Sequence, residues 1–204
     1  PTGSPVAGTF AALDMGAQTL AGTYTIVATN TTTTCTNNMT GSAVISINPL
    51  PTAFAVTGGG TICSGGAGLN IGLAGSQTGI TYKLYKSGVM VGSPVTGTGA
   101  AFNFGTFTAA GTYTVTATNS GGCSSNMSGS ATVTIASLPT VYTVGGGGIY
   151  CAGGAGVAVT LSGSQTGVTY QLILSGSPTC APMTGTGLAL NFGLQTTAGT
   201  YSVV

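Results

Sequence analysis

The chain has 204 residues and a formal net charge of +1, and 1% of its residues are charged, against about a quarter in an average globular protein. Its only charged side chains belong to Asp14, Lys83 and Lys86, and it contains no His, Glu, Arg or Trp. This composition excludes paired-carboxylate and histidine-based acid–base catalysis, and it leaves a Ser or Cys nucleophile without an activating base. It also excludes a carboxylate cluster for calcium and a basic patch for nucleic acid. We therefore expect no enzyme activity, no cofactor and no metal.

The near absence of charge also bears on association. A surface without net charge lacks the repulsion that keeps protein molecules apart, so we expect the chain to associate with copies of itself. No run of about 18 apolar residues is present, so no membrane span is predicted. The N-terminus shows no basic-then-apolar segment of the signal-peptide kind.

One sequence motif occurs three times in closely related forms, as AGTYTIVATN at Ala21, AGTYTVTATN at Ala110 and AGTYSVV at Ala198. The remainder of the chain repeats with the same spacing of 88 residues, and one extra residue lies in the Thr run 31–34. A fixed internal period of this kind indicates a tandem repeat.

Two proline-containing stretches, NPLPT at 48–52 and SLPT at 137–140, separate the repeats, since proline stiffens short linkers. The predicted organisation is therefore the C-terminal half of one repeat (1–48), one complete repeat (49–136) and a third repeat that lacks its last strands (137–204). We call these the N-terminal segment, the central repeat and the C-terminal repeat.

Apolar and polar residues alternate in the central repeat, which predicts strands. In chain order, the predicted strands lie at 53–57, 69–73, 81–86, 100–104, 112–118 and 131–135. Clusters of Gly, Ser, Asn and Pro separate them, and the 3.6-residue apolar period of a helix is absent. Six or seven short strands within 88 residues predict a β-sandwich, in which Tyr113 stands where a tyrosine corner is expected. The rival fold is a β-solenoid, but we find no shorter period within the 88 residues.

The segment AGTYTVTATNSGGCSSNMSGSATVTI, followed by LPT and then by a C-x-GGAG motif, resembles the Ig-like and PKD-like repeats of giant secreted surface proteins. These proteins belong to gliding, biofilm-forming Gram-negative bacteria, and gliding-motility adhesins are among them. The resemblance implies tandem Ig-like β-sandwich domains of about 88 residues in an extended array, export to the outer cell surface, and a role in adhesion or filament building. Family repeats are often richer in Asp, whereas the matching position here reads NSGGC, so no calcium site is carried over.

The incomplete outer repeats have two explanations. The sequence is a window on a longer array, or subunits exchange strands, so that residues 1–48 of one copy complete residues 137–204 of another. We favour the window, because residues 1–27 duplicate residues 178–204 and simple complementation would supply the same strands twice.

Five cysteines, Cys35, Cys63, Cys123, Cys151 and Cys180, are candidates for disulfides. In an Ig-like path, the loops that carry Cys63 and Cys123 lie at opposite ends of one domain, about 25 Å apart, whereas a disulfide needs Cα atoms within about 7 Å. We therefore expect pairing between domains or between chains. Buried, unpaired cysteines remain the alternative, and a redox or metal role is disfavoured.

The other motifs have simpler explanations. Asn30, Asn38 and Asn126 fit the N-glycosylation pattern, although a solvated loop is the favoured explanation. The Gly runs at 57–61 and 145–148 lack the helix and Lys of a phosphate-binding loop, and they indicate positive φ or close packing instead.

We therefore expect a non-catalytic structural repeat segment of an extracellular bacterial filament or cell-surface stalk, whose partners are copies of itself. The alternative function is an adhesin binding module that recognises surface glycans or other cells through its inter-strand loops.

Overall fold

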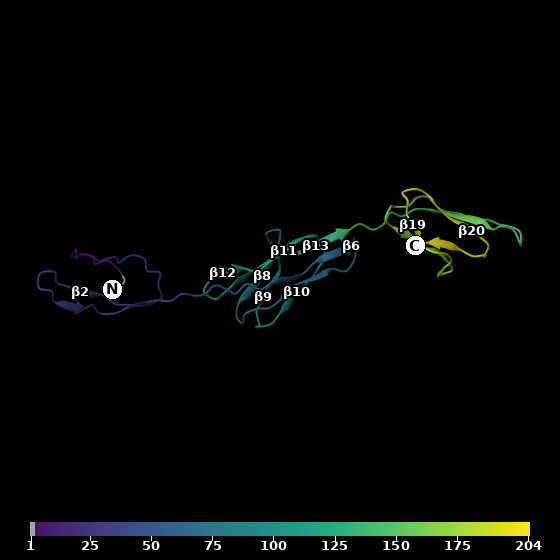
Figure 1. Cartoon of the computed structure of the whole chain (residues 1–204). Coiled ribbons are helices and arrows are strands. Elements are labelled where there is room, and N and C mark those ends of the chain that lie inside the picture. Colours follow the sequence, from purple (N-terminus) through teal and green to yellow (C-terminus); the bar gives the residue numbers. More distant parts are fainter. Residues whose placement is uncertain (1–2) are drawn as a thin grey trace. The chain divides into compact units, whose positions relative to one another are not determined.

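The computed structural model describes residues 3–204 (Figure 1). All regular elements in this range are β-strands, which confirms the all-β prediction, and none is a helix that could cross a membrane. The chain forms two compact units. One comprises the chain up to Gly60 together with Gly68–Thr134, and the other comprises Thr61–Ala67 together with Ile135–Val204. The boundaries of the three sequence repeats stay a prediction.

The N-terminal segment contains four short strands in two antiparallel ladders. The strands are β1 (Gly22–Tyr24), β2 (Val27–Thr29), β3 (Thr36–Asn38) and β4 (Ala43–Ile45). β1 pairs with β4, and β2 pairs with β3. Most side chains of this segment are exposed, including Met39 and Val44.

The central repeat contains nine strands in two sheets. They are β5 (Val56–Gly58), β6 (Gly60–Cys63), β7 (Leu69–Leu73), β8 (Thr81–Lys86), β9 (Val89–Thr96), β10 (Phe102–Phe107), β11 (Gly111–Thr118), β12 (Ser124–Asn126) and β13 (Ala131–Ala136). One sheet has the order β10-β7-β5, and the other has the order β6-β13-β11-β8-β9 with β12 paired to β11.

Side-chain alternation along β11 builds the core of the central repeat. Tyr113, Val115 and Ala117 are at most 1% exposed, whereas Thr112 before Tyr113 and Thr114 before Val115 face solvent. Thr fits the pleated surface of a sheet, so the alternating sequence places apolar side chains in the core and Thr side chains on the outer face. The alternation predicted from the sequence is confirmed.

Aromatic rings join the two sheets of the central repeat into a sandwich. Tyr82 of β8 meets Phe102 of β10 edge-on, with ring centroids 5.5 Å apart. Phe107 of β10 lies 5.2 Å from Tyr113 of β11. Tyr82 and Tyr113 belong to one sheet and the two phenylalanines to the other, so these contacts close the core between the layers.

A glycine run carries the chain from one sheet to the other. Gly58, Gly59 and Gly60 all have positive φ, at 97°, 83° and 135°. β5 ends at Gly58 in the three-stranded sheet, and β6 begins at Gly60 in the larger sheet. The loop expected to carry Cys63 is therefore a wrong prediction, because Cys63 is the last residue of an additional strand, β6.

The C-terminal repeat contains eight short strands. They are β14 (Val144–Gly146), β15 (Val157–Leu161), β16 (Thr169–Tyr170), β17 (Leu172–Leu174), β18 (Ser177–Pro178), β19 (Met183–Thr184), β20 (Leu190–Gln195) and β21 (Tyr201–Val203). The sheet orders are β14-β15-β20, β18-β17-β21 and β16-β19. Val159, Leu161, Tyr170, Leu172, Leu190 and Phe192 form its buried core.

Candidate functional site

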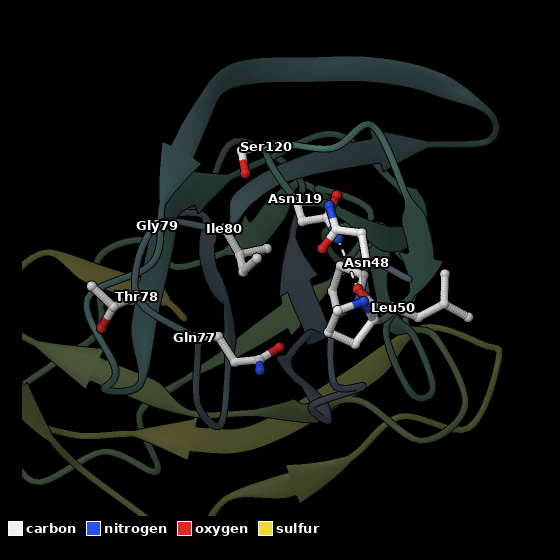
Figure 2. A pocket seen from close by; sticks show the side chains of 10 residues that line it. Asn48, Leu50, Gln77, Thr78, Gly79, Ile80, Asn119 and Ser120 are labelled. Atoms are coloured by element: carbon white, nitrogen blue, oxygen red, sulfur yellow. Dashed lines mark hydrogen bonds between the residues drawn. The ribbon is translucent and has the colours of Figure 1, made fainter. Parts of the chain in front are cut away.

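A polar pocket lies at the N-terminal end of the central repeat, where the linker reaches the sandwich (Figure 2). The linker residues Asn48–Pro51 form one wall of a pocket of about 270 Å³. The loop Gln77–Ile80, together with Asn119 and Ser120, forms the other.

Asn119, which follows β11, fixes the linker through its side chain. Its Nδ2 donates to the carbonyl oxygen of Pro49 at 2.8 Å. Its Oδ1 accepts from the backbone N–H groups of Gly121 (3.0 Å) and Cys123 (2.9 Å), which holds the amide in place. The Cys123 thiol in turn donates to the carbonyl oxygen of Asn48 at 3.6 Å. The loop after β11 therefore binds the linker at two successive carbonyls.

Gln77 fixes the linker from the opposite wall. Its Oε1 accepts from the backbone N–H of Thr52 at 2.6 Å. Its own backbone N–H donates to the hydroxyl of Tyr82 at 2.8 Å, and Tyr82 is fully buried. A core tyrosine therefore positions the residue that holds the linker. We call Gln77 and Asn119 the linker clamp.

The same arrangement recurs in the C-terminal repeat. Gln165, which follows Gln77 by 88 residues, accepts from the N–H of Thr140 through its Oε1. Its backbone N–H donates to the Tyr170 hydroxyl at 2.9 Å. The buried Ser164 donates to the carbonyl of Leu188 at 2.6 Å, as Ser76 does to Ala100 in the central repeat.

The chemistry of the clamp is neutral. Amide, hydroxyl and backbone groups make all of its hydrogen bonds, and no ionisable carboxylate or imidazole takes part. Among residues 3–204, no three His, Cys, Asp or Glu side chains gather in a way that could hold a metal ion. The arrangement binds the chain's own linker. Sequence reasoning missed Gln77 and Asn119, although the invariant GSQTG at 75–79 and 163–167 would have pointed to the Gln.

A second recurring contact holds the loop before each AGTY strand. The hydroxyl of Tyr113 donates to the carbonyl of Ala109 at 2.8 Å, and those of Tyr24 and Tyr201 reach the residue four positions earlier in the same way. Burial raises the pKa of the Tyr113 phenol, so this hydroxyl remains a donor. The tyrosine corner expected from the sequence is present in all three copies.

The five candidate disulfide cysteines are free thiols within the described chain. Cys35, Cys63, Cys151 and Cys180 are exposed, and Cys123 is half-buried beside the linker. Cys63 ends β6, where the neighbouring Ser64 N–H donates to the carbonyl of Ala136 at 2.8 Å. Pairing between domains or chains stays a prediction.

The three candidate glycosylation residues lie on the surface. Asn38 ends β3 and Asn126 ends β12, and both are exposed. Asn30 accepts from the N–H groups of Thr32 and Thr33 through Oδ1, so it also stabilises the turn that corresponds to the Asn119 loop. Glycosylation stays a prediction.

Comparison with known protein families identifies the type of β-sandwich that the central repeat forms. Residues 51–136 match the family model described as "Ig-like domain CHU_C associated". This segment is an Ig-like domain. The Ig-like domain is flanked by segments that repeat its sequence and its tyrosine corner. The resemblance drawn from the AGTY and C-x-GGAG motifs is confirmed.

Two further comparisons concern solved structures and curated proteins. A solved structure of a Ca²⁺-stabilised adhesin that helps an Antarctic bacterium reach out and bind ice is similar to this chain, with 18% identity and a TM-score of 0.39. The similarity covers 89% of this chain and 54% of the adhesin chain, so the present chain spans about half of that structure. No curated protein matches the chain.

Proposed function

We propose that the chain is a structural repeat segment of an extracellular bacterial filament or cell-surface stalk, and that it associates with copies of itself. The observation that carries this proposal is that the repeated domain binds its own linker through the same hydrogen bond in two repeats. Gln77 and Gln165 hold the backbone of Thr52 and Thr140 in the same way, 88 residues apart. A linker that is hydrogen-bonded to its own domain bends less than a free one, which suits a stalk.

The surface chemistry supports the same function. With three charged side chains in 204 residues, neighbouring repeats meet without charge repulsion. Polar Thr side chains on β11 and β13 cover the outer face of the larger sheet, which leaves this face without charge for lateral association. The lack of His, Glu and Arg supports a non-catalytic role, and the Ig-like family supports placement at the cell surface.

Electron microscopy of material from cells that produce the protein tests this function. Antibodies against the chain should label surface filaments with an axial repeat of about 35–45 Å, the length of one sandwich plus its linker, or a multiple of it. Label confined to the cell interior, or to isolated globules of about 60–70 Å, would contradict the proposal. Binding to glycans through the inter-strand loops would instead favour the adhesin module.

A further inference from the structure

Side chains of opposite charge lie in different repeats of this chain. Asp14, the only carboxylate among the side chains, belongs to the N-terminal segment, whereas Lys83 and Lys86 both lie on β8 of the central repeat. Asp14 is exposed, and the two lysines are half-buried. Within the described residues, no ion pair joins Asp14 to either lysine. All three charges are therefore available to a partner outside the fold of a single chain.

The local structure does not need the charge of Asp14. Its Oδ1 accepts from the backbone N–H of Gly16 at 2.8 Å. The counterpart of Asp14 in the C-terminal repeat is Asn191, whose Oδ1 accepts from the N–H of Gly193 at 2.9 Å in the same way. The central repeat has Asn103 at this position. A neutral amide oxygen therefore makes the same turn contact, and the turn does not require a negative charge.

Lys83 also occupies a position that a neutral residue fills in another repeat. Its backbone pairs with that of Thr116 on β11. Its two neighbours along β8 are buried, so the alternation of the strand places Lys83 on the outer face of the larger sheet. In the C-terminal repeat the counterpart is Gln171, which likewise pairs with Val204 through N–H to carbonyl hydrogen bonds of 2.8 and 3.0 Å. This position in the sheet therefore does not require a lysine.

The hydrocarbon part of Lys86 packs against the glycine that begins β11. A Cβ added to Gly111 would lie 3.1 Å from Cγ and 3.2 Å from Cδ of Lys86. In the C-terminal repeat Leu174 takes the place of Lys86, and a Cβ added to Gly199 would collide with its Cδ1. An uncharged side chain therefore provides the same packing, and the packing does not require the ammonium group of Lys86.

The charges consequently distinguish repeats that are otherwise alike. The carboxylate occurs at position 14 and at neither of its counterparts, and the ammonium groups occur in the central repeat and not at their counterparts in the C-terminal repeat. Neutral faces of similar repeats pair almost equally well at any offset of a whole repeat. Opposite charges that meet at a single offset favour that offset, because complementary charges fix the register of an interface more than its affinity.

We propose that neighbouring copies of the chain associate side by side with a stagger of one repeat, so that the carboxylate of Asp14 in one copy pairs with the ammonium group of Lys83 in the next. Lys86 lies three positions along the same strand, about 10 Å away, and adds to the attraction. The inference rests on the proposed self-association and names the contact that sets its register.

Charge complementarity identifies a second copy as the partner. Each copy offers the carboxylate that the lysines lack, on an exposed side chain, and each offers the ammonium groups that Asp14 lacks. An exposed ion pair changes an association constant by about two- to fivefold, so this pair selects the register and does not by itself hold the assembly together. The uncharged Thr-covered face around Lys83 supplies the remaining contact area.

Carbodiimide cross-linking of the full chain tests this register, because the reagent joins a carboxylate directly to an amine. Few products can form, since the side chains offer one carboxylate and two amines. A mixture of unlabelled and nitrogen-15-labelled chains distinguishes links between copies from links within one copy. Mass spectrometry after chymotrypsin digestion should find Asp14 of one isotope joined to Lys83 of the other, with Lys86 in a minor product.

The chain itself supplies matched variants, because its repeats carry neutral residues at the counterpart positions. Asp14→Asn, Lys83→Gln and Lys86→Leu each introduce such a residue. In sedimentation at about 0.02 M salt, the first two should weaken association about two- to fivefold and the third should weaken it less. Asp14→Lys should weaken association further, and adding Lys83→Glu to it should recover most of the association.

Three outcomes would contradict this register. Equal association of wild type and Asp14→Asn, or Asp14 links confined to single copies, would overturn it and leave self-association intact. Weaker association in Lys83→Gln with no change in Asp14→Asn would assign the lysine to another anionic partner, and would overturn it as well. A wild-type chain that stays monomeric at every concentration would overturn the proposed self-association itself.

Discussion

At the scale of single residues, one tyrosine in each repeat donates its hydroxyl to the loop four residues before it. Tyr113 buries its ring against Phe107 and donates its hydroxyl to the carbonyl of Ala109. Tyr24 and Tyr201 make the same hydrogen bond, but Tyr24 lies in an exposed segment. The same local contact is therefore integrated into a core in the central repeat and not in the N-terminal segment.

The raised pKa of Tyr113 predicts how stability depends on pH. The folded state keeps its phenol proton to higher pH than the unfolded state, whose pKa is about 10. Between these two values the folded state binds more protons, so the free energy of unfolding falls as pH rises above about 10 and is unaffected by this group below it. Urea unfolding of the full chain at pH 7 to 11 measures this dependence.

Tyr113→Phe should remove this contribution to the pH dependence. It should also lower the free energy of unfolding at pH 7 by about 0.5–1.5 kcal/mol, the usual net value of one hydrogen bond. Tyr24→Phe is the control on a half-buried ring outside the central repeat, and it should change the stability of the central repeat little. An unchanged alkaline loss of stability in Tyr113→Phe would show that another group is responsible.

At the scale of elements, the glycine run before β6 determines how the first strand of the repeat is divided between the sheets. Gly58 packs so closely on β7 that an added Cβ would lie 1.9 Å from the carbonyl oxygen of Asn70. Its φ of 97° is also unfavourable for any residue with a side chain. Both the backbone conformation and the available space therefore require glycine at this position.

Gly58→Ala should consequently destabilise the domain by about 2–5 kcal/mol, because it combines backbone strain with overpacking. Gly122→Ala provides the control, since Gly122 has a φ of 80° but no atom within 4 Å of an added Cβ. The control should lose only about 1–2 kcal/mol through backbone strain. Thermal and urea unfolding measure both values, and equal losses would mean that the contact with Asn70 relaxes freely.

The linker clamp gives a second prediction at this scale. Gln77→Ala removes the acceptor of the Thr52 N–H, so the Thr52 amide should exchange its hydrogen about tenfold faster, which corresponds to the net strength of about one hydrogen bond. Gln165→Ala should have the same effect on Thr140 and none on Thr52. Hydrogen exchange resolved by residue measures both amides in both variants. Acceleration at both amides in either variant would indicate general destabilisation and not a local clamp.

At the scale of the whole molecule, hydrogen bonds and apolar burial hold the folded chain, and ion pairs contribute little. The sequence offers one acidic and two basic side chains for 204 residues. Salt screens charge–charge interactions, so it has few to weaken in this chain. The buried side-chain nitrogen and oxygen atoms of the described residues all have hydrogen-bond partners, so neutral contacts satisfy the interior.

The melting temperature should therefore shift by less than about 2 °C between 0.05 and 1 M sodium chloride, since few charges respond to screening. Calorimetry at fixed protein concentration measures this shift. Sodium sulfate is an informative contrast, because it should raise the melting temperature by strengthening apolar burial. A large decrease in sodium chloride would reveal an electrostatic contribution that the composition does not suggest.

The sequence allowed prediction of the strands whose side chains alternate, and it failed where backbone geometry decides. β8, β11 and β13 were expected because apolar and polar residues alternate along them. β9 was missed because Gly92, with a φ of 71°, and Pro94 interrupt the pattern, and its ladder with β8 contains a register shift. The short β6 was missed because it begins within a glycine run.

The linker clamp was hidden from sequence reasoning for a different reason. Gln77 and Asn119 are ordinary polar residues of loops, and 42 positions separate them in the chain. Only the folded sandwich brings them to the two walls around Pro49 and Thr52. The repetition of GSQTG marks the Gln as constrained, but its acceptor role follows from the tertiary structure.

The passage of the first strand through Gly58–Gly60 affects how the domain responds to tension. Because β5 belongs to one layer and β6 to the other, a pull on the linker is transmitted to hydrogen bonds of both layers. Mechanical unfolding would then require the hydrogen bonds between β5 and β7 and those between β6 and β13 to break together. The central repeat would therefore resist stretching as a single mechanical element.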